Sequence, residues 1–223
     1  MKTRLKSLIS LLVAVAMILS ICPTVSFAAD VTYQLRDLND GSSTEVALAD
    51  YSLYETDHFV VIYDTDGANT ITSTQLATLG ETLENCWALF IDKMGMEPTS
   101  TSVHDDGDKT TQYKTNVVVM GTGVDHYELG AGEWGAYGSV DTAGYPYFMC
   151  SVTAITSPTV VAHEFGHAVH YAQGDNAWEN NIFLGPWFEA VANWFAEQYI
   201  YEYMDSTTTQ MSHLYLRKSH LTK

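Results

Sequence analysis

Hydrophobic residues recur along the chain with two different spacings, one typical of strands and one of helices. Runs of β-branched and aromatic residues predict strands at residues 58–64, 113–120 and 145–153, with a short extended piece near 135–141. Apolar residues three and four positions apart predict a long helix over residues 73–94. Residues 29–57 carry polar stretches and are expected to form a lead-in segment before the first strand.

Another helix is predicted over residues 157–174. Ser157 is a favourable N-cap, Pro158 suits the first helical position, and Gly174 is a natural stop. Apolar residues at helical spacing mark its core side: Val161, Phe165, Ala168, Val169 and Ala172. The opposite side carries polar residues: His163, Glu164, His167 and His170. The helix therefore has one side for packing and one for chemistry.

The last predicted helix covers residues 186–203. We expect one face to carry mainly apolar residues, namely Trp187, Phe188, Val191, Trp194, Phe195 and Gln198, and the other to carry Glu189, Asn193 and Ala196. A carboxylate among bulky apolar neighbours needs a partner or a metal ion, because burying an unpaired charge is costly. Without repeats or a clear linker, residues 29–223 are expected to form a single α+β domain.

The sequence His163-Glu164-Phe165-Gly166-His167 places two histidines one helical turn apart on the same side of a helix. Their ring nitrogens can converge on one cation, and zinc suits imidazole ligands in tetrahedral geometry. Glu164 then stands beside the ion, in the position of a general base for an activated water molecule. The motif fixes only three positions, so its context decides whether it is a metal site.

Catalytic zinc sites use three protein ligands, and Glu189 is the best candidate for the third. It follows His167 by 22 residues, on a helix that a short loop can fold back against the first. Asn193, one turn beyond Glu189, is expected to hold a ligand histidine. Glu179 ranks lower because it lies in a polar loop, and Glu197 is expected to be solvated or to support the site.

The N-terminus has the features of a secretory signal peptide. Residues 1–28 combine a basic start, an apolar run and small residues before a cleavage site at Ala29. The mature part of about 195 residues then has seven basic and 27 acidic residues, a formal charge of −20. We expect a secreted protein with no membrane span in its mature form. Nucleic acid is excluded as a partner, because phosphates bind basic surfaces.

Acidic segments and cysteines add little to the predicted site. Residues 64–67 and 105–108 could serve Ca²⁺, but neither completes a calcium loop, and solvated turns are the favoured interpretation. An exported protein can pair Cys86 with Cys150, although the sequence cannot show that they lie within bridging distance. No CxxC pattern supports ligation of zinc by cysteine.

Taken together, HEFGH and the sequence WFEAVANWFAEQ about twenty residues later resemble the gluzincin branch of zinc metallopeptidases, the thermolysin-like arrangement. The resemblance covers roughly residues 158–198. It implies a single catalytic Zn²⁺ with three ligands and one general base: His163, His167 and Glu189, with Glu164 as the base. Asn193 occupies a position where the family often has Asp. The resemblance also implies a zincin fold, in which a mixed sheet lies over the active helix and its edge strand binds extended peptide.

Hydrolysis of peptide bonds in proteins or peptides is the activity that this resemblance implies. Zinc lowers the pKa of its water to about 7 and polarises the scissile carbonyl, while Glu164 carries the proton to the leaving amine. The donor that stabilises the oxyanion stays open among Tyr201, Tyr203, His213 and Tyr215. The chain departs from the family at its end, because only about twenty residues follow Tyr203, where thermolysin-like enzymes carry a helical subdomain.

Two alternatives are weaker. A metzincin site requires Gly and His where this chain has His170 and Gln173, so His170 is interpreted as a neighbour of the site. A catalytically inactive zincin-fold protein could instead bind extracellular protein or polysaccharide through surface aromatic residues: Trp134, Tyr137, Tyr145 and Tyr147. Glu164 argues against this second alternative, since a purely structural zinc ion has no need of a base.

Overall fold

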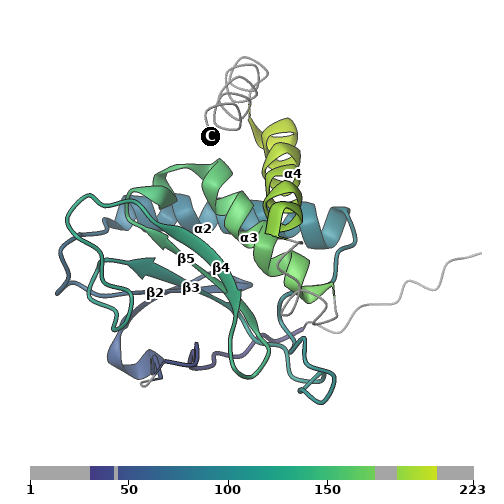
Figure 1. The fold of residues 1–223 in the computed structure, drawn as a ribbon, viewed down its shortest axis with the longest axis horizontal. Coiled ribbons are helices and arrows are strands. Elements are labelled where there is room, and N and C mark those ends of the chain that lie inside the picture. The colour runs from purple at the N-terminus through teal and green to yellow at the C-terminus, as the bar shows by residue number, and fades with distance from the viewer. Residues whose placement is uncertain (1–30, 43–44, 174–184, 205–223) are drawn as a thin grey trace, which may run out of the picture. The chain divides into compact units, whose positions relative to one another are not determined.

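A five-stranded mixed β-sheet with helices packed on one face forms the framework of the protein (Figure 1). The structure is a computed structural model and describes residues 31–42, 45–173 and 185–204. Apart from Val31, these residues belong to one compact unit that spans Thr32–Lys223. The predicted signal peptide lies outside the described residues. Among the helices that are described, none is long and apolar enough to cross a membrane.

The elements follow one another in the order expected for an α+β protein. In chain order they are η1 (Leu48–Asp50), β1 (Ser52–Glu55), β2 (Phe59–Tyr63), α2 (Ser73–Trp87), η2 (Ala88–Lys93), β3 (Thr115–Met120), β4 (Ala136–Val140), β5 (Pro146–Ser151), η3 (Ala154–Thr156), α3 (Pro158–Ala172) and α4 (Gly185–Tyr203). The predicted strands and helices are confirmed, with ends that differ by a few residues. The predicted helix over 73–94 continues through its last turn as the π-helical segment η2.

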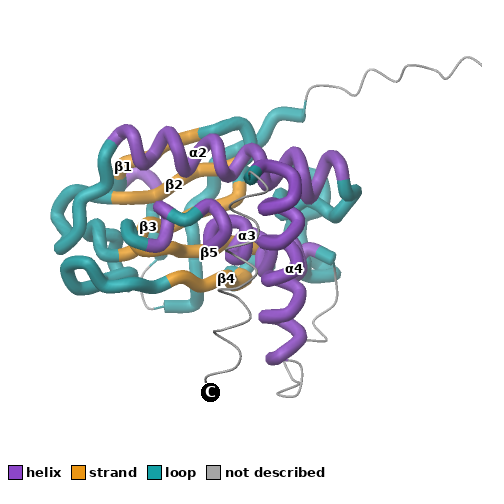
Figure 2. Tube along the Cα trace, turned by 90° about the horizontal axis from the view of Figure 1, so that it is seen from above, coloured by secondary structure: helices purple, strands orange, loops and turns teal. Residues whose placement is uncertain are grey.

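The strand order is β1-β2-β3-β5-β4, as the view from above shows (Figure 2). The three central strands β2, β3 and β5 run parallel, and each outer strand pairs antiparallel with its neighbour. The central strands are almost entirely buried, because both faces of the sheet are covered. β4 is an edge strand, and it lies beside the helix that carries the two histidines.

Strand β1 was not expected from the sequence, where residues 29–57 read as a lead-in segment. Its four residues, SLYE, are only partly buried and carry no clear alternation of apolar and polar side chains. It becomes a strand because its backbone pairs with β2 from Ser52 opposite Tyr63 to Glu55 opposite Val60. Tertiary pairing, rather than local preference, therefore decides this element.

Helix α2 and helix α3 cover one face of the sheet. Thr72 and Gln75 form a capping box at the start of α2, and Gly95, at φ 72°, follows η2 at its end. Phe165 of α3 lies at the centre of an aromatic cluster, with ring contacts to Phe59, Phe90 and Phe148. This apolar contact fixes how α3 lies on the sheet.

The opposite face of the sheet is covered by residues from the N-terminal segment and the loop before β4. Leu38, Val46 and Leu48 pack there with Tyr127 and with residues of the central strands. Arg36 from the same segment forms an ion pair with the buried carboxylate of Asp141 in the turn between β4 and β5. The backbone N–H groups of Ala143 and Tyr145 also donate to Asp141. The end of the edge strand is therefore anchored by a residue from the start of the domain.

Helix α3 is in close contact with both β4 and α4, and a glycine permits each approach. A Cβ atom at Gly166 would lie 2.8 Å from Cβ of Phe195 in α4, and Gly138 of β4 faces His167 in a similar way. Such distances leave no room for a methyl group. The strand, the histidine-bearing helix and α4 are therefore held together at the position where the predicted site lies.

Candidate metal centre

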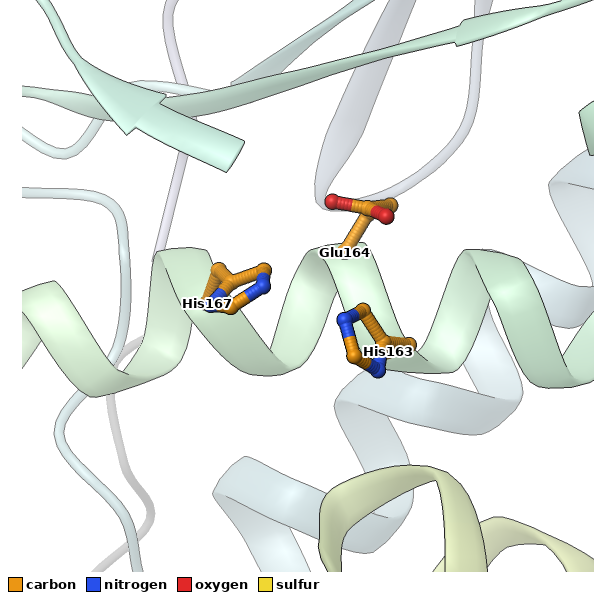
Figure 3. A group of neighbouring side chains, drawn as sticks. All are labelled: His163, Glu164 and His167. Atoms are coloured by element: carbon orange, nitrogen blue, oxygen red, sulfur yellow. The ribbon is translucent and has the colours of Figure 1, made fainter. Parts of the chain in front are cut away.

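Helix α3 presents His163, Glu164 and His167 together, as the spacing predicts (Figure 3). Potential ligand atoms of these three side chains all lie within 4.8 Å of one another. The two imidazole rings are one turn apart, with centroids separated by 4.8 Å. In the part of the chain that the structure describes, they form the only group of at least three such residues that could hold a metal ion.

Glu189 of α4 lies against both histidines. Its carboxylate oxygens are 3.3 Å from Nε2 of His163 and 3.6 Å from Nε2 of His167. The structure therefore brings together the four residues predicted for the site, three from α3 and one from α4. The reasoning that selected Glu189 was partly wrong, because its side chain is 62% exposed rather than buried among apolar neighbours. Its position at the mouth of the site, and not burial, brings it to the histidines.

The faces predicted for α4 are wrong. Trp187 and Trp194 are 61% and 42% exposed, whereas Ala196, assigned to the polar face, is buried. The buried face of the helix consists of Ala192, Phe195, Ala196, Tyr199 and Ile200. The small alanines and the close contact with Gly166 let α4 approach α3 on this side. This close packing buries the alanine face and leaves the two large tryptophans in solvent.

Asn193 supports His163, as its position one turn after Glu189 predicts. Its side chain hydrogen-bonds the imidazole of His163. This interaction and the carboxylate of Glu189 both favour the protonated ring, but burial outweighs them and lowers the pKa of His163. Burial, together with the neighbouring His163 and His170, lowers the pKa of His167 to about 4. Both rings are therefore neutral at pH 7, the form in which imidazole binds metal ions.

Glu164 lies in a different environment from Glu189. It is buried, and burial followed by the negative charge of Glu189 raises its pKa to about 8. The Cys150 thiol lies in β5, where burial and then the negative charge of Glu164 raise its pKa. A carboxyl group with such a pKa can exchange a proton near neutral pH. The two carboxylates of the site thus have separate roles available to them.

A cleft of about 380 Å³ opens over these residues. It is lined by β4 and the preceding loop, by α3 and by the start of α4: Trp134, Ala136, Tyr137, Gly138, His163, Glu164, His167, Tyr171, Phe188 and Glu189. Sequence reasoning did not assign Ala136, Gly138, Tyr171 or Phe188 to the site, and it named Trp134 and Tyr137 only as surface aromatic residues of the alternative binding protein. The available signals were the glycine- and aromatic-rich composition of residues 130–144 and the expectation, from the resemblance, that an edge strand binds peptide.

The remaining candidates lie elsewhere or outside the described residues. His170 is close to the site, with its ring 5.3 Å from that of Phe188. Tyr201 and Tyr203 lie at the far end of α4 and do not line the cleft. Glu197, two turns past Glu189, does not line it either. Glu179, His213 and Tyr215 are not among the described residues.

The cysteines and the acidic segments take no part in the site. Cys86 and Cys150 are buried and not joined to each other, so the disulfide considered from the sequence is not present. Asp64 accepts a hydrogen bond from the backbone N–H of Thr65, and Asp108 accepts from the backbone of Thr110. The Asp108 contact is typical of an Asx turn, and both contacts are local, which agrees with the interpretation of these segments as turns.

The fold and the site define an α+β protein in which His163, Glu164 and His167 could hold a metal ion. Residues 24–223 match the model of a family described as Family of unknown function (DUF6055), and the chain belongs to this family. No curated protein and no solved structure matches the chain. The function therefore has to be inferred from the site itself.

Proposed function

We propose that the protein is a secreted zinc-dependent peptidase that hydrolyses peptide bonds, with Glu164 as the general base. The observation that carries the proposal is the position of Glu189, whose carboxylate meets the Nε2 atoms of both HExxH histidines from a second helix. A helix that only packed against the sheet would not require two neutral imidazoles and a carboxylate to meet at the mouth of a cleft. Secretion rests on the signal-like sequence of residues 1–28.

The donor set fits zinc. Two imidazole nitrogens and one carboxylate are a common ligand set of catalytic zinc, which leaves one position open. Ligands at about 2.0 Å from a tetrahedral ion are separated from one another by roughly 3.3 Å. The distances from Glu189 to His163 and His167, 3.3 and 3.6 Å, lie close to this spacing. Asn193 would orient His163 by its hydrogen bond.

Bound zinc would supply a polarised carbonyl and a water molecule of lowered pKa. Glu164, buried in the wall of the cleft, would accept a proton from that water and deliver it to the leaving amine. Burial and the charge of Glu189 raise the pKa of Glu164 to about 8, and a cation held nearby would lower it, which would make the carboxylate available as a base.

Strand β4 offers a place for an extended peptide. The backbone N–H of Ser151 donates to Gly135 O, and that of Asp141 donates to Tyr145 O. In the register of the β4–β5 pair, the N–H and C=O groups of the alternate residues Ala136, Gly138 and Val140 therefore point away from β5. No described strand pairs with this edge. A peptide added there would lie along the cleft, above Glu164 and His167.

The resemblance to gluzincins supports the same function. The resemblance implies a mixed sheet over the HExxH helix with an edge strand beside it, and the mixed sheet with β4 at its edge is consistent with that arrangement. The departure concerns the oxyanion donor, because Tyr201 and Tyr203 do not line the cleft. Apart from the two histidines, the side chains of the described lining that carry a neutral donor are Trp134, Tyr137 and Tyr171.

The test compares wild-type protein with the Glu164→Gln variant. Both should bind one zinc ion per chain, and the variant should lose roughly a hundred- to ten-thousandfold in the rate of cleavage of a denatured protein substrate. A chelator should abolish wild-type cleavage, and added zinc should restore it. Absence of zinc from purified protein, or a Glu164→Gln variant that cleaves at the wild-type rate, would refute the proposal.

An inactive binding protein of the same fold is the second candidate. Trp134 and Tyr137 are both exposed at the cleft, which favours it, whereas Tyr145 and Tyr147 are buried and cannot form part of a binding surface. Stoichiometric zinc without cleavage of any denatured protein or peptide would select this candidate over the peptidase.

A further inference from the structure

Trp134 is presented at the rim of the cleft on a rigid loop. The side chain of Asn69 donates to the carbonyl oxygens of Leu129 and Gly130 and accepts from the N–H of Gly132. On the other side of Trp134, the N–H of Gly135 donates to the Ser151 hydroxyl. These contacts fix both ends of the loop, yet the Trp134 side chain between them is 62% exposed.

A mostly exposed indole on a hydrogen-bonded loop offers an apolar face for binding, because most of that face is not used for packing within the protein. The neighbouring residue is acidic. Glu133 precedes Trp134 in the chain, and its carboxylate accepts a hydrogen bond from the backbone N–H of Gly130 in the same loop. The wall opposite β4 adds the aromatic ring of Phe188.

Acidic side chains greatly outnumber basic ones in the described residues. Described residues include 23 acidic and four basic side chains, and each of the four bonds to an oxygen of the protein: Arg36, Lys93, Lys109 and Lys114. No lysine or arginine lines the cleft in the described part of the chain. The resulting negative potential attracts cations and repels acidic peptides.

We propose that the cleft selects polypeptides that carry a lysine or arginine side chain in contact with Trp134. The cation would lie on the indole face, with Glu133 nearby, and the rest of the segment would lie along β4. Aromatic faces bind ammonium and guanidinium groups, and the excess of acidic residues in the described chain adds to this attraction. The inference rests on the proposed function, since it names the substrate class of the same cleft.

The experiment measures binding separately from cleavage. One lysine is moved stepwise along a neutral peptide, and each peptide is paired with a version in which norleucine, of equal length but uncharged, replaces lysine. Binding is measured with zinc-loaded Glu164→Gln protein. In the best register the lysine peptide should bind roughly three- to tenfold more tightly than its norleucine partner. The ratio should fall in high salt, because the attraction is partly electrostatic.

Trp134→Leu should bring the lysine-to-norleucine ratio close to one while still binding apolar peptide. Trp194→Leu is the matched control, because Trp194 is exposed on α4 but does not line the cleft, and it should keep the wild-type ratio. Equal binding of the two peptides in every register would overturn the inference. So would tighter binding of a glycosylated peptide that is lost in Trp134→Leu, which would assign the indole to sugar stacking.

Cleavage of the same peptides by wild-type protein tests the proposed function independently. Cleavage without lysine preference leaves the peptidase standing and overturns the substrate class. Lysine-selective binding without cleavage would support the cation-binding site and overturn the peptidase, because the site would then belong to a binding protein.

Discussion

Gly138 of β4 lies directly against His167 of α3. A Cβ atom at position 138 would be 2.6 Å from Cβ of His167 and 3.1 Å from the carbonyl oxygen of Glu164. The edge strand and the metal-binding helix can be this close only because residue 138 has no side chain. The free backbone groups of the strand thereby come within reach of any molecule that enters the site.

Gly138→Ala should displace the strand or the helix, because neither neighbouring atom belongs to a flexible end of a side chain. We expect a loss of about 1–3 kcal/mol in unfolding free energy, together with weaker zinc binding. Thermal unfolding and zinc titration would measure the two effects. Ser139→Ala is the control, since Ser139 faces the other side of the sheet and hydrogen-bonds Tyr147. Wild-type stability and zinc affinity in Gly138→Ala would contradict this expectation.

Glu189→Gln should weaken zinc binding by roughly tenfold or more, because an amide replaces the charged ligand that faces both histidines. The fold should persist, since the Glu189 side chain is exposed and buries little area. Competition with a chromophoric chelator would give the zinc affinity. Glu197→Gln, two turns along the same helix, should leave it unchanged. If both variants bound zinc as wild type does, Glu189 would not be a ligand.

Glu84 should make stability depend on acid pH. Burial tends to raise its pKa, but hydrogen bonds from His58 and Thr56 prevail and lower it below the usual 4.5. A carboxyl group with a lowered folded-state pKa stabilises the protein above pH 4.5, and this contribution is lost as the pH falls through the folded-state value.

Glu84→Gln should therefore cost about 1 kcal/mol at pH 7, with the difference from wild type shrinking below pH 4. Denaturant unfolding at several pH values would follow this. Glu81→Gln, at an exposed position on the same helix, serves as the comparison and should show little change at any pH. A penalty for Glu84→Gln that stays constant down to pH 3 would show that the ionised carboxylate is not the cause.

Cys86 and Cys150 should behave as buried thiols. Burial raises the pKa of both well above the usual value, and thiolate is the reactive form. Iodoacetamide should leave both unmodified in native protein at pH 8 and modify both in denaturant without prior reduction. Mass spectrometry of proteolytic fragments resolves the two sites. A fragment that links Cys86 to Cys150 would show that they pair after all.

Most of the fold follows from local patterns. The strands β2, β3 and β5 are continuous apolar runs, and the capping box at Thr72 with Gly95 beyond η2 marks one helix clearly. β1 was not predicted because its four mixed residues show no clear strand pattern, and only the pairing with β2 makes them a strand. The sequence also could not show that Arg36 reaches Asp141, because the two residues are 105 positions apart.

The site divides in the same way. His163, Glu164 and His167 are fixed by helical spacing alone, so they could be found from the sequence. Glu189 was found as the third ligand that a catalytic zinc site needs and from the resemblance, but its expected burial was wrong, because the rotation of α4 depends on the contact between Gly166 and Phe195. Trp134 could be named from the sequence as a surface aromatic residue, but only the structure shows that it lines the same cleft as the two histidines.

The ion pair between Arg36 and Asp141 joins residues 105 positions apart. Contacts of such separation form late in folding, because the cost of closing a long loop comes before the gain from the contact. The β4–β5 turn follows strand β4, which lines the cleft, and its position therefore depends on Arg36, which lies more than a hundred positions earlier in the chain. The helices can form from local contacts, but the cleft acquires its final shape only when the start and the middle of the domain meet.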